Sequence, residues 1–424
     1  MRTLFLFIFL GCFSEVVAQN LERAKEHIAL LCSKDFEGRG YTNNGHIKAA
    51  DFIESQFKQF GLQPLEEKEF QQQFKVSANT FKGKHLLKIN GKALKLGVDY
   101  IVEPSSPTGK GKTEVYEIDT IGLRTENKLA EISRLINTGK KLLISNIGKT
   151  DYKGTIYGIK AAENPAVLFE KTDDKLTWHI SSSLSNTVHF KIKEAALPNE
   201  VKQIKYRVKN DFVENITTQN VVAQVKGTTH PDSILLFTAH YDHIGQMDKT
   251  SFVAGANDNA SGIAMLINLA EHYSKNPALY TCVFIAFGGE ELGLLGAKHF
   301  VDSWWLDLET IKFQINLDIV GGGSDGVQIV NSRVFSNAYN LMNSINTKNK
   351  YLKQLKLRGA AYNSDHAPFY EKDVPCFFIY TLGGPPHYHD VFDKAETLPL
   401  TGYEGLFKLI VDFADKVEGV DLSK

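Results

Sequence analysis

Short, unbroken apolar runs recur through the second half of the chain, and they constrain its fold more than any other feature. These runs occupy residues 220–225, 233–239, 282–287, 313–320 and 374–380. Strands that are buried on both faces carry such runs, whereas a strand with one wet face alternates apolar and polar residues. Stretches with helical periodicity lie between the runs, for example at 261–273 and 401–418. Strand alternating with helix predicts an α/β fold with a mostly parallel sheet that helices cover on both sides.

The first half of the chain has a different pattern. Amphipathic helices are expected at 21–33 and 44–60, and Gly61 ends the second one. From about residue 76 the helical period is lost: Asn90-Gly91 is a hairpin signal, and residues 187–193 alternate like a strand. The chain is therefore expected to consist of a leader at 1–18, an N-terminal helical part of the main domain at 19–75, a β-rich insert at 76–212 and the main α/β domain at 213–424.

The N-terminus has the pattern of a secretory signal peptide. Arg2 precedes an apolar run that is too short to span a bilayer, and small residues follow up to Ala18. We expect residues 1–18 to be cleaved off and the protein to be secreted or periplasmic, with no membrane span. Leu10-Gly11-Cys12 faintly resembles a lipoprotein-processing site, but Phe9 fits such a site poorly. Lipid anchoring at Cys12 is therefore the less favoured alternative.

Charge and cysteine content exclude several classes of function. The 424 residues carry 48 basic and 49 acidic side chains, a net charge of -1, so no charge excess favours nucleic acid or an anionic membrane as partner. Apart from Cys12, the cysteines are Cys32, Cys282 and Cys376, widely spaced and without a Cys-x-x-Cys pair. This set predicts neither a disulfide framework nor a thiolate metal site. Any metal would have to be held by His, Asp or Glu.

Potential metal ligands stand where the apolar runs end. They are His240 and Asp242 after 233–239, Asp258 before the helix at 261–273, Glu290 and Glu291 after 282–287, Asp318 within 313–320, and His389 after 374–380. Each is a weak signal alone, because glutamates often start helices and an aspartate between asparagines can be turn chemistry. The carboxyl ends of parallel strands meet at one sheet edge, where ligands usually bind. Carboxylates crowded at that edge predict a bound cation.

The ordered motifs of this half resemble those of the M28 zinc exopeptidases, a family that includes aminopeptidases with two zinc ions. The motifs are AHYDHIG (239–245), ANDNASG (256–262), GGEELGLLG (288–296), NLD (316–318), SDHAPF (364–369) and HYHD (387–390). The likeness covers 213–424 and extends to an N-terminal part with Glu37-Gly38-Arg39. It implies a phosphorylase/hydrolase-like exopeptidase fold. The insert at 76–212 is similar in placement and strand content to the protease-associated insert of some members.

The resemblance also implies roles for individual residues. His240 and Asp318 would hold one zinc ion, Glu291 and His389 the other, and Asp258 would bridge them; other divalent metals would fit the same donors. Asp242 would orient the His240 imidazole through its carboxylate. Glu290 would be the general base that takes a proton from water. The substrates would be peptides with a free N-terminus.

Some residues and classes stay open at this stage. Asp365 and His366 lie in a family motif and are expected to support the site, and Tyr362 is a candidate donor to a tetrahedral oxyanion. His243 and His387 lie near the ligands, but no motif gives them a role. The alternatives to an aminopeptidase are a carboxypeptidase or dipeptidase of the same superfamily, a glutaminyl-cyclase-like enzyme with one zinc ion, and a non-enzymatic binding module. The intact set of ligands disfavours the last two.

Overall fold

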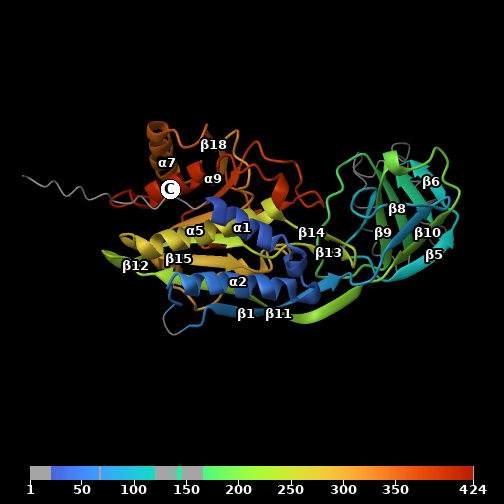
Figure 1. Cartoon of the computed structure of the whole chain (residues 1–424), viewed down its shortest axis with the longest axis horizontal. Coiled ribbons are helices and arrows are strands. Elements are labelled where there is room, and N and C mark those ends of the chain that lie inside the picture. The colour runs from blue at the N-terminus through green and yellow to red at the C-terminus, as the bar shows by residue number, and fades with distance from the viewer. Residues whose placement is uncertain (1–20, 66–67, 120–133, 135–140, 146–165, 424) are drawn as a thin grey trace, which may run out of the picture.

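A large sheet with helices on both faces forms one part of the molecule, and a β-rich region extends from one end of it (Figure 1). The structure is a computed structural model that describes residues 21–65, 68–119, 134, 141–145 and 166–423. The predicted signal peptide at 1–18 and Cys12 lie outside the described residues. No helix within these ranges is long and apolar enough to cross a membrane.

The large sheet confirms the predicted mostly parallel α/β fold. Across the sheet its strands are β1 (Gln71–Thr80), β11 (Asp211–Val225), β15 (Tyr280–Phe287), β12 (His230–His240), β16 (Ile311–Leu317), β19 (Cys376–Thr381), β17 (Val327–Val330) and β18 (Leu355–Leu357). The central pairs β15–β12, β12–β16 and β16–β19 are parallel. The β1–β11, β11–β15 and β19–β17 pairs are antiparallel. The parallel centre is the part that brings successive strand ends to one edge.

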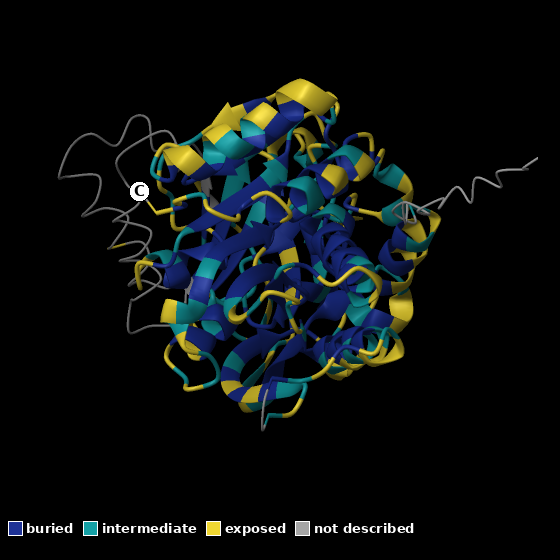
Figure 2. Ribbon diagram, turned by 90° about the vertical axis from the view of Figure 1, so that its left-hand side faces the viewer, coloured by how far each residue is buried: buried dark blue, intermediate teal, exposed yellow. Residues whose placement is uncertain are grey.

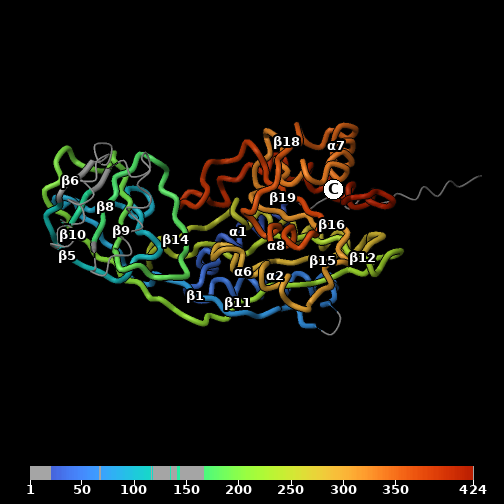
Figure 3. The backbone as a smooth tube through the Cα atoms, turned by 180° about the vertical axis from the view of Figure 1, so that it is seen from behind, coloured from blue at the N-terminus to red at the C-terminus, as the bar shows by residue number. Residues whose placement is uncertain are grey.

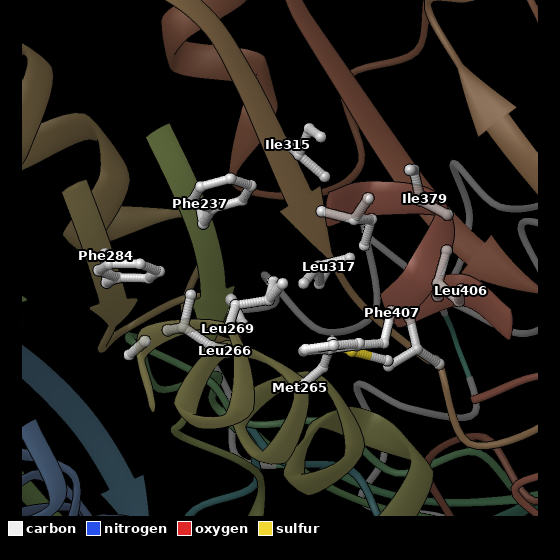
Figure 4. Close-up of a cluster of buried hydrophobic side chains, with 14 of the residues drawn as sticks. Phe237, Met265, Leu266, Leu269, Phe284, Ile315, Leu317, Ile379, Leu406 and Phe407 are labelled. Atoms are coloured by element: carbon white, nitrogen blue, oxygen red, sulfur yellow. The ribbon is translucent and has the colours of Figure 1, made fainter. Parts of the chain in front are cut away.

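The central strands are buried on both faces, as their unbroken apolar runs predict. In β12, Leu235 and Phe237 pack on one face of the sheet, whereas Ile234 and Leu236 pack on the other. Figure 4 shows Phe237 and Phe284 of neighbouring strands facing Leu266 of the adjacent helix. Figure 2 shows the buried residues in the middle of the molecule with exposed residues around them. Burying one such side chain contributes about 1.5–3 kcal/mol, so this double-sided packing holds the sheet edge in place.

Helices cover the two faces unequally. One face carries α1 (Leu21–Leu31), α2 (Gly45–Gln59), α5 (Ser261–Lys275), α7 (Ser336–Asn349) and α9 (Tyr403–Ala414). The other carries the shorter α6 (Leu295–Val301) and α8 (His366–Tyr370). The helices expected at 21–33, 44–60, 261–273 and 401–418 are present with bounds shifted by a few residues. Gly61, with φ 79°, follows the end of α2 as predicted.

We call residues 81–210, between β1 and β11, the inserted region. Its described strands form two sheets, one of β3 (Lys92–Ala93), β2 (Leu86–Ile89), β10 (Ile204–Val208) and β5 (Gly109–Thr113), and one of β4 (Tyr100–Val102), β9 (Thr187–Lys193), β8 (Ala166–Thr172), β7 (Leu142–Ser145) and β6 (Tyr116–Asp119). The Asn90-Gly91 hairpin is confirmed, because Ile89 pairs with Lys92. The parallel pairs among β6, β7, β8 and β9 were not predicted. The division of the chain into domains at 76 and 212 remains a proposal.

Candidate metal centre

Five of the sequence-predicted ligands lie together at the carboxyl edge of the central strands. His240 is the last residue of β12, Asp318 directly follows β16, and Glu291 stands shortly after β15. Asp258 lies in the short segment Ala256–Ala260 that leads into α5, and His389 lies in the loop after β19. All five side chains are at least nine-tenths buried. The structure therefore forms one shielded donor cluster from five separate elements.

Two groups of donors share Asp258. In the first, His240 Nε2 lies 3.3 Å from Asp258 Oδ1 and 3.3 Å from Asp318 Oδ1. In the second, His389 Nε2 lies 3.0 Å from Asp258 Oδ2 and 3.2 Å from Glu291 Oε2. The donor atoms of each group lie within 4.8 Å of one another. One carboxylate thus presents one oxygen to each imidazole.

The second group also contains His243, a residue to which the sequence assigned no role. Its ring is fully buried, and its Nδ1 lies 2.7 Å from Glu291 Oε1. The same Nδ1 lies 4.0 Å from Asp258 Oδ1. His243 therefore holds one oxygen of Glu291 while the other faces His389. The only sequence signal for it was its place three residues after His240, which did not separate it from an ordinary buried histidine.

The donor set fits a divalent cation such as zinc. Nitrogen and oxygen donors of His, Asp and Glu are the ones that zinc takes when no cysteine is present. Asp258 Oδ2 is buried and lies 3.0 Å from His389 Nε2, so its charge is costly unless something positive faces it. Burial alone lowers the pKa of His389, but Glu291 and Asp258 outweigh burial and raise it to about 11. Without a metal, a proton on His389 supplies the positive charge that these carboxylates face, and a bound metal would take its place.

Asp242 orients His240 by a different route from the one expected. The carbonyl oxygen of Asp242 lies 3.1 Å from His240 Nδ1, and because a carbonyl only accepts, Nδ1 carries the hydrogen and Nε2 is free for the site. The Asp242 carboxylate is 4.0 Å from that nitrogen. It instead accepts the Glu290 backbone N–H at 3.0 Å and the Tyr41 hydroxyl at 3.4 Å. The carboxylate therefore holds the backbone that carries Glu290.

Glu290 has different surroundings from its neighbour Glu291. Burial raises the pKa of Glu290 well above its usual range, and the nearby Glu291, Asp365 and Asp318 carboxylates act in the same direction. Among the described residues, no ion pair or hydrogen bond joins the Glu290 carboxylate to a histidine of the centre. The backbone of Gly289 before it is left-handed, with φ 73°, which favours glycine. After this turn the two adjacent glutamates have different neighbours: Glu291 contacts the histidines of the second donor group, and Glu290 does not pair with them.

The three weaker sequence candidates separate in the structure. Asp365 is fully buried near the centre, and within the described residues neither of its oxygens has a hydrogen-bond partner. His366 points away, because its Nε2 lies 2.9 Å from the Ala361 carbonyl and its ring packs on Phe378. Tyr362 is 57% exposed, and its ring lies 5.8 Å from Tyr370. The structure therefore places only Asp365 among the site carboxylates.

Arg39 supports the backbone around the centre. The sequence indicated this residue only as part of the motif Glu37-Gly38-Arg39. It is fully buried and donates hydrogen bonds to five backbone carbonyls, of Leu31, Tyr241, Ala254, Gly255 and Asp258, at 2.6–3.2 Å. From the other side, Asp393 accepts the N–H groups of Asn257 and Asp258 at 2.8 and 3.1 Å. Together these two residues fix the backbone that carries the shared carboxylate.

We expect Arg39→Met to lower the free energy of unfolding by at least about 3 kcal/mol, because it leaves several buried carbonyls unpaired at about 1–3 kcal/mol each. Urea unfolding of the metal-free protein measures this change. Arg23→Met is the matched control: Arg23 is 34% exposed and pairs with Glu271, so its loss should cost less than about 1 kcal/mol. Equal losses in the two variants would contradict the structural role of Arg39.

The fold and the donor set define an α/β protein with a buried carboxylate–imidazole centre, and comparison with known proteins shows what it is similar to. Residues 220–414 match the model of peptidase family M28. The chain is 31% identical over 274 residues to aminopeptidase YwaD of Bacillus subtilis (strain 168). The matched stretch covers 61% of this chain and 58% of that relative. It is 38% identical over 143 residues to a probable zinc metalloprotease of Pyrenophora tritici-repentis, over 31% of this chain and 32% of that one. Residues 220–414 are therefore similar to peptidase family M28, and the chain spans 58% of the length of the first of these relatives.

Solved structures share the fold of nearly the whole chain. An aminopeptidase from Aneurinibacillus sp. strain AM-1 superposes with a TM-score of 0.67 at 20% identity, over 96% of this chain and 95% of that one. The zinc aminopeptidase BSAP from Bacillus subtilis gives a TM-score of 0.67 at 22% identity, over 94% and 95%. The likeness therefore extends beyond the domain matched by the family model and includes the inserted region. It confirms the expected fold.

Proposed function

We propose that this protein is a secreted or periplasmic aminopeptidase with two zinc ions. The Asp258 carboxylate supports this most directly, because its two oxygens face two histidines in two donor groups. His240 and Asp318 would hold one ion, Glu291 and His389 the other, with Asp258 between them. The relatives named as aminopeptidases and zinc metalloproteases support both the metal and the reaction. Export rests on the pattern of residues 1–18.

The chain's own residues would divide the work of hydrolysis as follows. The residues named above would hold the zinc, which would supply a lowered pKa for a water molecule and polarisation of the peptide carbonyl. Glu290 would take the proton of the attacking water and return it to the leaving amine, a task that suits a buried carboxylate with a raised pKa. His243 would keep Glu291 in place through the contact at 2.7 Å. The buried walls around these groups would exclude bulk water.

The charge around the centre favours substrates with a free N-terminus. Asp258, Glu291 and Asp318 would bind the two ions, which leaves Glu290 as the carboxylate of the centre that can meet an α-ammonium. A carboxypeptidase would need a fixed cation for the substrate carboxylate. Among the described residues, no ion pair joins a Lys or Arg side chain to the carboxylates of the centre. A free carboxylate beside the proposed ions therefore favours the aminopeptidase over the carboxypeptidase alternative.

Peptide amides with a free amino group should be hydrolysed. Acetylation of that amino group should lower kcat/KM at least about 100-fold, because the acceptor groups that bind the α-ammonium would then lack their partner. The measurement is a panel of leucyl and alanyl amides and their N-acetyl forms, each with and without a chelator. Chelation should abolish hydrolysis, and added zinc should restore it. Cleavage of N-acetylated peptides from their C-terminal end at comparable rates would favour the carboxypeptidase. Cyclisation of N-terminal glutamine with one bound ion would favour the cyclase alternative.

A further inference from the structure

A short segment of the inserted region lies directly on the loop that carries His389. The segment is Lys175–His179, between β8 and β9, and the loop is His387–Asp390, after β19. Figures 1 and 3 show the red part of the chain after β19 reaching toward the green inserted region. Trp178 and His389, which are in contact, are 211 residues apart in the sequence. The contact therefore depends on the inserted region being folded.

The backbone of Trp178 fixes the orientation of the His389 ring. The Trp178 carbonyl oxygen lies 2.9 Å from His389 Nδ1, so this nitrogen carries the hydrogen and donates it. The Trp178 N–H in turn donates to the His389 carbonyl at 3.0 Å. With Nδ1 committed to this bond, Nε2 is the nitrogen left for a metal, and it faces Asp258 and Glu291 at 3.0 and 3.2 Å. Such a partner sets the tautomer and direction of a metal-binding imidazole.

Lys175 holds the same loop on both sides of His389. Its ammonium donates to the carbonyls of Pro386 and Tyr388 at 2.7 and 2.6 Å, and it pairs with Asp390 Oδ2 at 2.9 Å. His389 itself has a left-handed backbone, with φ 55°. For a residue other than glycine this conformation costs about 1–2 kcal/mol and persists only where the surroundings hold it. Lys175 and Trp178 supply contacts that hold it.

The segment is rigid because it is anchored in the core of the inserted region. Trp178 is 3% exposed, and its Nε1–H donates to the Val102 carbonyl at 2.7 Å. The same core contains Met247 and Val253 of the hairpin β13 (Gly245–Asp248) and β14 (Ser251–Val253), and Val391 packs against it. That hairpin joins His243 to Asp258 along the chain. The inserted region thus packs against the hairpin between His243 and Asp258 and against Val391, which follows His389 closely in the chain.

We propose that Lys175 and Trp178 are positioning residues that hold His389 in its metal-binding orientation, so that the inserted region sets the affinity of one of the two metal sites. This inference rests on the proposed two-metal centre. The site of His240 and Asp318 would not depend on the contact, because in the described structure those ligands lie at the ends of β12 and β16 in the main sheet. The expected consequence is a selective loss at one site.

The test is zinc binding to the full-length protein, measured by competition with a chromogenic chelator. Lys175→Met should weaken one of the two zinc affinities by about 10- to 100-fold, the range known for outer partners of metal ligands, and leave the other within about twofold. Trp178→Phe keeps the backbone carbonyl at His389 but loses the bond to Val102 and part of the buried ring, so it should weaken the same affinity by a smaller factor. Lys175→Arg should restore most of it. Lys82→Met is the matched control, because Lys82 pairs with Asp211 outside the loop, and it should leave both affinities unchanged.

Each other result has a definite meaning. Two unchanged zinc affinities in a folded Lys175→Met protein would overturn the positioning role and leave the two-metal centre intact. Equal weakening of both sites, together with a lower Tm, would also overturn it, because the loss would then come from general destabilisation. A wild-type protein that takes up no zinc would overturn the proposed metal centre and this inference with it. Metal affinity is measured here without substrate, so the outcome does not depend on the reaction direction.

Discussion

Glu290→Gln is expected to lower kcat by about 10²- to 10⁴-fold while the metal content stays unchanged. The change keeps the size and hydrogen bonding of the side chain but removes the group that accepts a proton. Among the described residues no hydrogen bond or ion pair joins the Glu290 carboxylate to the histidines of the donor groups, and burial raises its pKa well above the usual range although the charge of His240 opposes this. Its backbone N–H stays bonded to Asp242 in the variant. Hydrolysis of leucyl amide and metal analysis of the same sample measure the two quantities.

Glu291→Gln is the matched control at the adjacent position. Glu291 contacts His243 at 2.7 Å and His389 at 3.2 Å, and those two histidines lower its pKa against the effect of burial. Removing its charge should therefore weaken metal binding, and the lost activity should return in part at high zinc concentration. If Glu290→Gln lost the metal and Glu291→Gln retained it, the roles of the two glutamates would be reversed.

The positions of the ligands could be predicted because they follow from local patterns. A buried strand such as 233–239 is visible as an unbroken apolar run, and the residue at its end, His240, must then lie at the carboxyl edge of a parallel sheet. Asp318 follows in the same way from the strand before it. These two assignments need no knowledge of which strands are neighbours. They need only the direction of each strand.

The supporting contacts could not be predicted, because they depend on how distant segments meet. Arg39 binds carbonyls more than 200 residues away along the chain, and no periodicity marks such a partner. The role of Trp178 is carried by its backbone carbonyl, which every residue possesses, so the side-chain sequence holds no signal for it. For the same reason the sequence assigned the orientation of His240 to the Asp242 carboxylate, whereas the structure uses the Asp242 carbonyl. Tertiary geometry decides which group of a residue is in reach.

Asp258 is the residue on which both donor groups depend. Its Oδ1 lies 3.3 Å from His240 and its Oδ2 lies 3.0 Å from His389. Each of the other ligands belongs to one group only. Its backbone is held independently of its carboxylate, by Arg39 at the carbonyl and by Asp393 at the N–H. The carboxylate can therefore be removed without removing the contacts that hold the loop, which makes this position suitable for a test of the shared ligand.

Asp258→Ala is expected to empty both metal sites and lower kcat/KM by at least about 10³-fold, because several kcal/mol of metal-ion stabilisation are lost and each 1.36 kcal/mol is tenfold in rate. The measurement is metal content after dialysis, with the Tm of the metal-free protein as a check of folding. His389→Ala is the control and should empty mainly one site, since His240 and Asp318 stay in place. Asp258→Asn, which keeps an oxygen for one histidine, should lie between the two. If Asp258→Ala kept one ion as tightly as His389→Ala does, the carboxylate would serve a single site and the bridging role would be wrong.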